Sequence, residues 1–371
     1  MIQRCPRCGQ KNRLPETMPK NGEYRCGQCQ AVLQSGSRVL RMLKDIPLLL
    51  SGIYVLLLAA LTLSNSIGPE RWWLGSLNLY LPQWPWAIPG GLLLLLTLCL
   101  RRWKLCALNF SGLLWVFGPI MGFSTGGLHP SVAGTGTPIR VMTYNVKWSS
   151  RDGHAISEDI ARYHPDLLQM QDSSGVMLGE VGQALKGWNV RIDGQYLIAS
   201  PHPLPALESR DISFDGSDHH CVRYLLKIGG RTVTVYDVHL LSPREGLMSV
   251  GHSQTEGMSE NADYRQEEAL RLAGYVNQEQ GPVVLTGDLN APVQSLVCRS
   301  LFDAGLRDAF SEAGVGYGYT YGRFTHVGQP YVRIDHIMVS KQWQVTRCTV
   351  GNEIGSDHCP VIADLVLSNE K

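Results

Sequence analysis

Charged side chains are absent from three long stretches in the first 140 residues of this 371-residue chain. No Asp, Glu, Lys or Arg occurs in 46–69, 72–100 or 105–139. Apolar stretches of such lengths are typical of segments that cross a bilayer. The rest of the chain has the mixed composition of an ordinary soluble domain. The sequence therefore predicts a membrane region, over 46–123, followed by a separate water-exposed domain.

Three transmembrane helices are predicted within this region, near residues 46–63, 86–100 and 105–123. The second is the shortest and has a re-entrant segment as its alternative. The first connecting loop is rich in aromatic residues, as expected of a belt at a membrane surface; they are Trp72, Trp73, Tyr80, Trp84 and Trp86. Buried helices of a soluble protein are the alternative for each stretch. Three such stretches so close together, flanked by tryptophans, favour a multi-pass membrane protein.

Positive charges predict the orientation of these spans. Three basic residues precede the first span and three separate the second from the third, namely Arg38, Arg41, Lys44, Arg101, Arg102 and Lys104. Because basic loops favour the cytoplasmic side, the N-terminus and the second loop are expected in the cytoplasm. Three crossings then place everything after residue 123 outside the cytoplasm. If the short second stretch does not cross, that conclusion reverses.

Two CxxC pairs lie ahead of the first span. They are Cys5 with Cys8 and Cys26 with Cys29, and 17 residues separate the pairs. Four thiolates at this spacing are typical of a structural tetrahedral zinc site, with disulfides as the alternative. Residues 1–35 are therefore predicted to form a zinc ribbon that needs its metal to fold. A zinc thiolate site suits a reducing compartment, which agrees with a cytoplasmic N-terminus.

Six short motifs follow in the last 230 or so residues. They are TYNV at 143–146, LQMQD at 168–172, YDVHL at 236–240, GDLNAP at 287–292, RIDHI at 333–337 and SDH at 356–358. Together, and in this order, they resemble the endonuclease/exonuclease/phosphatase superfamily, which includes DNase I-like nucleases, sphingomyelinases and inositol phosphatases. The resemblance implies a four-layer α/β sandwich over 139–368. A flexible linker is predicted ahead of it, over 124–138.

Hydrophobic patterning places several of these motifs at the ends of strands. Apolar and β-branched runs predict strands at 139–146, 166–172, 232–240, 283–286, 334–339 and 361–367. Helical periodicity predicts helices at 155–163 and 261–280. Asn145, His239 and Asp288 then fall at or just beyond strand ends. Loops at strand ends carry functional groups on a rigid sheet, so we expect the site there.

The resemblance implies catalytic roles for His239, Asp288, Asn290, Asp335 and His358. Asp288 would orient or deprotonate an attacking water, and Asn290 would hold that water and a phosphate. The two histidines would contact the non-bridging and leaving oxygens of the phosphoester. Asp335 would bond to His358 and set its tautomer.

Three further residues are predicted to bind a metal. Asn145, Asp172 and Asp357 offer hard oxygen ligands, which suit Mg²⁺ or Mn²⁺ better than zinc. Asp172 stands where the family has a glutamate, one methylene longer. Lys147 stands where some members carry a second metal-binding acid, which favours one principal metal site.

These expectations together describe a membrane-tethered, divalent-metal-dependent phosphoesterase. The net charge of +1 gives no basic field that would argue for nucleic acid. Nucleic acid and a lipid head group both stay open as the phosphoester substrate. Membrane lipid is the other predicted partner, and no protein partner is predicted. The alternative is a catalytically idle family member acting as a membrane scaffold or binding domain, which only the Asp172 substitution supports.

Overall fold

The computed structural model describes residues 2–14, 23–35, 38–128, 135–149, 151–325 and 328–369, with the side chains of 34–44 left aside. Its internal contacts divide the chain into two compact units. The first consists of Met1–Ala59 and Trp86–Trp115, and the second of Ala60–Pro85 and Val116–Lys371. The residues between the first two apolar stretches therefore belong with the C-terminal domain, although the sequence placed them in the membrane region.

Two β-hairpins and three helices make up the first unit. The hairpins pair β1 (Ile2–Arg4) with β2 (Lys11–Arg13) and β3 (Glu23–Arg25) with β4 (Val32–Ser35). The helices are the greater part of α1 (Arg38–Ile67), α3 (Ala87–Cys99) and α4 (Trp103–Trp115). Tyr54 of α1 packs against Gly90 and Gly112, where an added Cβ would lie 2.5 and 2.7 Å from the tyrosine ring or hydroxyl. These glycines therefore let the three helices pack closely.

Within the described residues, one helical stretch, Asp45–Ile67, is long and apolar enough to cross a membrane. Only 22% of its most apolar window is buried, unlike a helix in the core of a soluble protein. The helices α3 and α4 have 13 residues each. At 1.5 Å per residue each spans about 20 Å, and the helical turns Trp84–Trp86 before α3 and Val116–Ile120 after α4 bring these lengths closer to a hydrocarbon core of about 30 Å. The structure thus supports one helix of spanning length where the sequence predicted three.

Two six-stranded sheets form the centre of the second unit. The β5 sheet has the order β15-β16-β5-β6-β8-β7, and the β12 sheet has the order β13-β14-β12-β11-β10-β9. The strands of the β5 sheet are β5 (Gly136–Asn145), β6 (Leu167–Gln171), β7 (Asn189–Asp193), β8 (Tyr196–Ser200), β15 (Trp343–Val350) and β16 (Val361–Ser368). Those of the β12 sheet are β9 (Glu208–Asp211), β10 (His220–Ile228), β11 (Arg231–His239), β12 (Val283–Asp288), β13 (Arg307–Asp308) and β14 (Asp335–Val339). In each sheet the central pair is parallel, β5 with β6 and β11 with β12.

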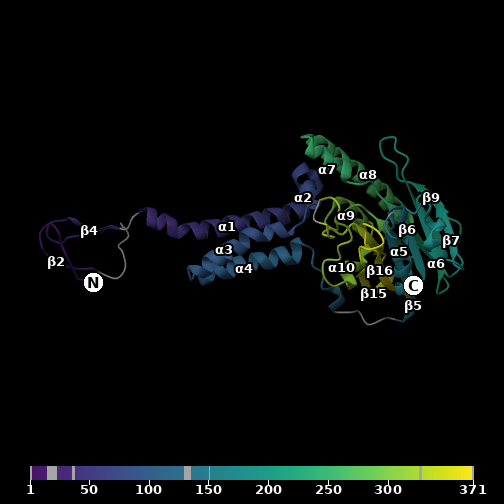
Figure 1. The fold of residues 1–371 in the computed structure, drawn as a ribbon, viewed down its shortest axis with the longest axis horizontal. Coiled ribbons are helices and arrows are strands. Elements are labelled where there is room, and N and C mark those ends of the chain that lie inside the picture. Colours follow the sequence, from purple (N-terminus) through teal and green to yellow (C-terminus); the bar gives the residue numbers. More distant parts are fainter. Residues whose placement is uncertain are drawn as a thin grey trace. The chain divides into compact units, whose positions relative to one another are not determined.

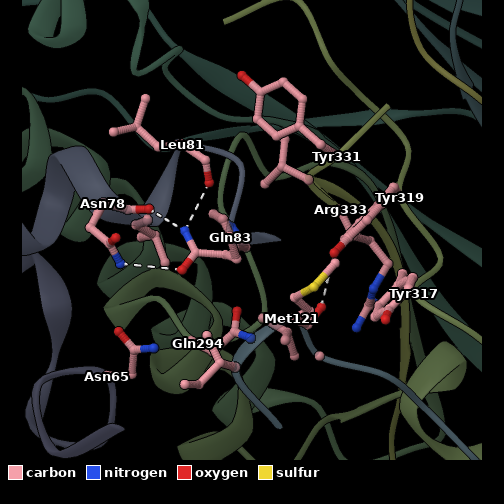
Figure 2. Close-up of a pocket in the computed structure, with 16 residues that line it drawn as sticks. Asn65, Asn78, Leu81, Gln83, Met121, Gln294, Tyr317, Tyr319, Tyr331 and Arg333 are labelled. Atoms are coloured by element: carbon pink, nitrogen blue, oxygen red, sulfur yellow. Dashed lines mark hydrogen bonds between the residues drawn. The ribbon is translucent and has the colours of Figure 1, made fainter. Parts of the chain in front are cut away.

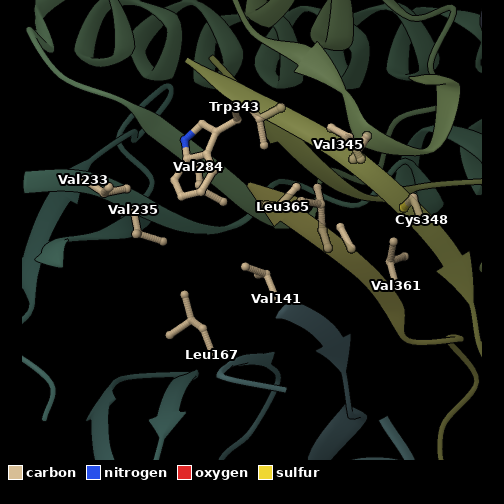
Figure 3. Close-up of a cluster of buried hydrophobic side chains, with 14 of the residues drawn as sticks. Val141, Leu167, Val233, Val235, Val284, Trp343, Val345, Cys348, Val361 and Leu365 are labelled. Carbon is tan, nitrogen blue, oxygen red and sulfur yellow. The ribbon is translucent and has the colours of Figure 1, made fainter. Parts of the chain in front are cut away.

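Helices cover the outer face of each sheet. The apolar sides of α5 (Gly153–Tyr163) and α6 (Glu180–Ala184) pack on the β5 sheet, and those of α8 (Thr255–Gln278) and α9 (Leu296–Asp303) pack on the β12 sheet. Between the sheets, Val141 and Leu167 face Val233, Val235 and Val284 (Figure 3). The short helices are α2 (Trp73–Leu79), α7 (Arg244–Gly251) and α10 (Ala309–Ala313) (Figure 1). The result is a four-layer α/β sandwich, and the strands and helices predicted for it are present with shifted ends.

Two segments expected to lie apart from the sandwich pack on it instead. Tyr80, expected in a membrane-surface belt, is fully buried in the second unit. Ser124, in the predicted linker 124–138, exchanges main-chain hydrogen bonds with Gly316 (2.8 and 3.0 Å). The strand β5 already begins at Gly136, and residues 129–134 lie outside the described part. Aromatic and Gly-rich composition misled both predictions, because burial by distant residues leaves no local pattern.

Candidate active site

Strand ends bring the predicted residues to one edge of the sandwich. Asn145 ends β5, His239 ends β11 and Asp288 ends β12. Asp172 directly follows β6. The strand β14 runs antiparallel to β12, and its first residue, Asp335, pairs with Asp288. Parallel pairs deliver both carboxyl ends to the same edge, so residues far apart in sequence meet there.

Close backbone packing fixes the loop that carries Asp288. Gly287 has φ +132°, and an added Cβ would lie 1.9 Å from the carbonyl oxygen of Val238. Only glycine fits there. Two residues later Asn290 adopts a left-handed φ of +49°, and its amide nitrogen Nδ2 donates to the Leu240 carbonyl at 2.8 Å. The GDLN motif is therefore required by the turn geometry as well as by its polar groups.

The Asp288 carboxylate is the centre of the site. Its Oδ2 accepts from Asn145 Nδ2 at 3.0 Å, and its Oδ1 accepts from the Asn290 main-chain N–H at 2.8 Å. The Nε2 atoms of His239 and His358 lie 3.6 and 3.7 Å from Asp288 Oδ2. Burial and the neighbouring Asp335 carboxylate raise the pKa of Asp288, while the two histidines act in the opposite direction. A raised pKa makes a carboxylate a better proton acceptor.

Each histidine is oriented by a partner on its other ring nitrogen. His358 Nδ1 lies 2.9 Å from Asp335 Oδ2, as the resemblance implied. Burial lowers the pKa of His358, but Asp335 and Asp288 raise it to about 9, which favours the protonated ring. His239 Nδ1 lies 2.6 Å from Gln195 Oε1. Gln195 was not predicted, because it sits in the short turn between β7 and β8 with no motif around it.

A cavity of about 260 Å³ opens onto these groups. Six predicted residues line it: Asn145, Asp172, His239, Asp288, Asn290 and His358. Asp335 and Asp357 stand outside the lining. The wall also contains the aromatic residues Trp148, Tyr321 and Phe324, and Arg244. The Tyr321 ring lies 4.5 Å from the His358 ring, and Arg244 donates to the Tyr321 hydroxyl at 2.8 Å. The wall therefore offers both cationic and aromatic contacts.

Oxygen donors for a divalent cation line the β5 side of this cavity, at Asn145 and Asp172, and a further one, Asp357, lies outside its lining. Asp172 points a carboxylate oxygen to within 3.8 Å of His239 Nδ1. Asn145 Oδ1 accepts one hydrogen bond, from the Lys147 N–H at 3.1 Å, which leaves a lone pair free. Asp357 Oδ2 pairs with Lys147 Nζ at 3.2 Å, whereas its Oδ1 is buried without a hydrogen-bond partner. These hard, under-used oxygens fit Mg²⁺ or Mn²⁺.

A second group of possible ligands lies deeper. Ligand atoms of Asp288, Asp335 and His358 all fall within 4.8 Å of one another. His358 Nδ1 is already hydrogen bonded to Asp335 there, as in a carboxylate–histidine pair. This arrangement is satisfied without an ion, so Asn145, Asp172 and Asp357 remain the better candidates.

The four N-terminal cysteines also converge. Sγ of Cys5 lies 3.5 Å from that of Cys29, and Sγ of Cys8 lies 3.5 Å from that of Cys26. All four sulfurs lie within 4.8 Å of one another, and all four cysteines are free of disulfides. Tetrahedral zinc with bonds of about 2.3 Å needs sulfurs about 3.8 Å apart. The cluster therefore fits a zinc ion.

Comparisons with known proteins identify the family of the C-terminal domain. A model of the Endonuclease/Exonuclease/phosphatase family matches residues 142–358. Similar solved structures include a family member from Bacteroides thetaiotaomicron (19% identity, 63% of this chain and 99% of that one, TM-score 0.48) and humanized TDP2 of D. rerio (14%, 62% and 98%, 0.50). An AP endonuclease from Archaeoglobus fulgidus is also similar (18%, 61% and 98%, 0.47). No curated protein matches the chain. At such identities the TDP2 likeness shows the fold alone.

Proposed function

The chain belongs to the endonuclease/exonuclease/phosphatase family, and from that premise we propose that it is a divalent-metal-dependent hydrolase of phosphoesters. The observation that carries the proposal is the convergence of both histidines, His239 and His358, on one oxygen of buried Asp288. A lone histidine or acid would be unremarkable in a buried network. Two imidazoles and a carboxylate at the base of an open cavity supply both a base and charge stabilisation for an attacked phosphate.

Each residue has a defined part in the proposed reaction. Asp288, whose pKa is raised, orients a water and takes its proton. His358, held protonated by Asp335 and Asp288, stabilises the charge that develops on the phosphoryl oxygens. His239, at the end of β11 and oriented by Gln195, faces the same Asp288 oxygen. Asn290 keeps one of its two amide protons for the phosphate, since the other is donated to Leu240.

A divalent cation completes the proposed site. Asn145 and Asp172 would hold it, together with the unpaired oxygen of Asp357. When bound, such an ion neutralises phosphoryl oxygens and aligns the substrate. Lys147 already occupies the other oxygen of Asp357 with a positive charge, which supports a single principal ion.

Tethering to a membrane is the second part of the proposal. The helix Asp45–Ile67 supports one crossing. The hairpin of α3 and α4, with Arg101 and Arg102 at its turn, is proposed to cross twice, so that the zinc ribbon lies in the cytoplasm and the sandwich outside. Leu178→Cys, at a 93% exposed position, tests this in intact cells. Labelling by a membrane-impermeant thiol reagent is expected before lysis; labelling only after lysis would reverse the orientation.

The activity test uses the full chain in detergent, with and without Mg²⁺ or Mn²⁺. Substrates are plasmid DNA, single-stranded nucleic acid, a phospholipid head-group diester and bis-p-nitrophenyl phosphate. Nucleic acids and lipid head-group diesters both contain a phosphodiester bond, so both classes are tested. Asp288→Asn is expected to lower turnover by about 10³-fold. Asp303→Asn, which changes an exposed acid on α9, is the matched control. A folded chain that neither binds the metal nor turns over any of these substrates would favour the idle scaffold instead.

A further inference from the structure

We propose that Tyr80 is a positioning residue for Asn290, which makes the segment between the first two apolar helices part of the active site. The inference rests on the proposed function, because it assigns a support to one of its residues. The Tyr80 hydroxyl donates to the Asn290 main-chain oxygen at 3.0 Å, across 210 residues of sequence. Tyr80 has no exposed surface.

Asn290 needs such support because of its backbone. A non-glycine residue at φ +49° costs about 1 kcal/mol and persists only where its surroundings hold it. Within the sandwich its N–H and its side-chain amide are held by Asp288 and Leu240. The bond from Tyr80 holds the third polar group, the carbonyl. Of these three supports, the bond from Tyr80 is the one whose donor lies outside residues 142–358, which the family model matches.

A buried arginine fixes the direction of the Tyr80 hydrogen bond. Arg265 of α8 donates through Nη1 to the Tyr80 hydroxyl, and its guanidinium carbon lies 5.1 Å from the centre of the tyrosine ring. Arginine has no acceptor, so the hydroxyl must accept from it and use its own proton elsewhere. Burial also raises the pKa of Tyr80, which keeps that proton in place. The Asn290 carbonyl is the partner that receives it.

The segment that carries Tyr80 is itself held in place. Glu70, nearly buried, accepts from the Leu296 N–H at the start of α9 at 3.0 Å. Leu79 and Tyr80 pack on Met258 of α8. The Gln83 side chain closes the following turn by donating to the carbonyls of Asn78 (2.6 Å) and Leu81 (2.8 Å), as Figure 2 shows. The hydroxyl therefore meets the catalytic loop from a fixed frame.

The next carbonyl of the loop, that of Ala291, is held by a side chain of the sandwich. His336 Nε2 lies 3.0 Å from the Ala291 oxygen, and His336 is buried in β14. Two consecutive carbonyls are thus fixed: that of Asn290 by Tyr80, and that of Ala291 by His336. Removing the Tyr80 hydroxyl alone would free the first while the second stays held, so we expect a tilt of the Asn290 peptide and not a collapse of the loop.

The test compares Tyr80→Phe with Tyr319→Phe in the full chain. Tyr319 also donates to a main-chain oxygen across a long sequence separation, that of Met121 at 3.2 Å (Figure 2), and it is not among the residues that line the catalytic cavity. For hydrolysis of bis-p-nitrophenyl phosphate, Tyr80→Phe should lower kcat about tenfold with KM unchanged, while Tyr319→Phe keeps both within twofold. Equal losses in the two variants, or a change in KM alone, would overturn the positioning role.

A second readout does not need turnover. Amide hydrogen exchange in residues 289–291 should accelerate about tenfold in Tyr80→Phe and stay unchanged in Tyr319→Phe. Unchanged exchange in Tyr80→Phe would overturn the inference even in an active protein. A wild-type chain without metal-dependent turnover would instead overturn the proposed function, and the exchange result would then decide on the loop support by itself.

Discussion

The two sheets contribute to the site in different ways. The β12 sheet supplies His239, Asp288 and Asp335 from strands whose loops are held by buried groups such as Tyr80 and His336. The β5 sheet supplies Asn145 at the end of β5 and Asp172 just after β6. The turn at Lys147–Ser149, directly after β5, has three consecutive positive φ angles. Trp148 in that turn is 55% exposed. The comparison indicates that the β12 side of the site is held in place before a ligand binds, whereas the β5 side stays open to ligands.

The largest expected difference between the sides comes from glycine substitutions. Gly287→Ala on the β12 side should lower the free energy of unfolding by about 4 kcal/mol, because its Cβ would overlap the Val238 carbonyl. Gly175→Ala on the β5 side also has a positive φ, +77°, but no atom within 4 Å of the new Cβ, and should cost about 1 kcal/mol. Denaturant unfolding measures both, and equal costs would contradict the comparison.

Ion pairs should show the next largest difference. Arg333 and Asp308, both almost fully buried beside the β12 sheet, lie 2.7 Å apart, and Asp308→Asn should cost about 3 kcal/mol. Asp364→Asn breaks the half-exposed pair with Arg140 in the β5 sheet and should cost less than about 1 kcal/mol.

The buried pair also predicts a pH dependence. Burial would raise the pKa of Asp308, but Arg333 and His336 lower it well below the ordinary value. A lowered pKa in the folded state means that the stabilisation is complete above the unfolded value of about 4 and is lost as the pH falls below it. The stability gap between wild type and Asp308→Asn should therefore shrink between about pH 4 and pH 2. A gap that is constant down to pH 2 would argue against this origin.

Metal affinity offers a smaller effect on the β5 side. Asp172→Glu restores the longer acid of the family and should tighten Mn²⁺ binding roughly tenfold, or about 1.4 kcal/mol. Titration calorimetry measures the change, with Asp303→Glu as an exposed control. Weaker binding in Asp172→Glu would mean that the cavity is built around the shorter side chain.

The smallest stability effect is expected at the exposed rim. Trp148→Gly suits the local φ of +57° and should change the free energy of unfolding by less than about 0.5 kcal/mol. We expect KM to rise about threefold, because the indole lines the cavity mouth. Leu178→Ala removes another exposed apolar side chain outside the cavity lining and should leave KM unchanged.

The sequence predicted the residues at the strand ends of the site, but not the residues that hold them in place. Strand patterns and motif order placed Asn145, His239 and Asp288 at strand ends, because alternation and turn residues are local signals. The supports of the site were missed. Tyr80 meets Asn290 across 210 residues, and Gln195 meets His239 across 44, with no spacing that records either contact. Tyr80 was hidden further by its tryptophan-rich neighbourhood, which composition alone assigned to a membrane surface.

The Tyr80 contact also sets an order of events during synthesis. Tyr80 leaves the ribosome 210 residues ahead of Asn290. At translation rates of roughly 5–20 residues per second, about 10–40 s pass before its acceptor exists. For most of that interval Leu79, Tyr80 and Glu70 have been made while their partners on α8 and α9 have not. A nascent chain must therefore shelter this apolar loop before it can finish its own active site.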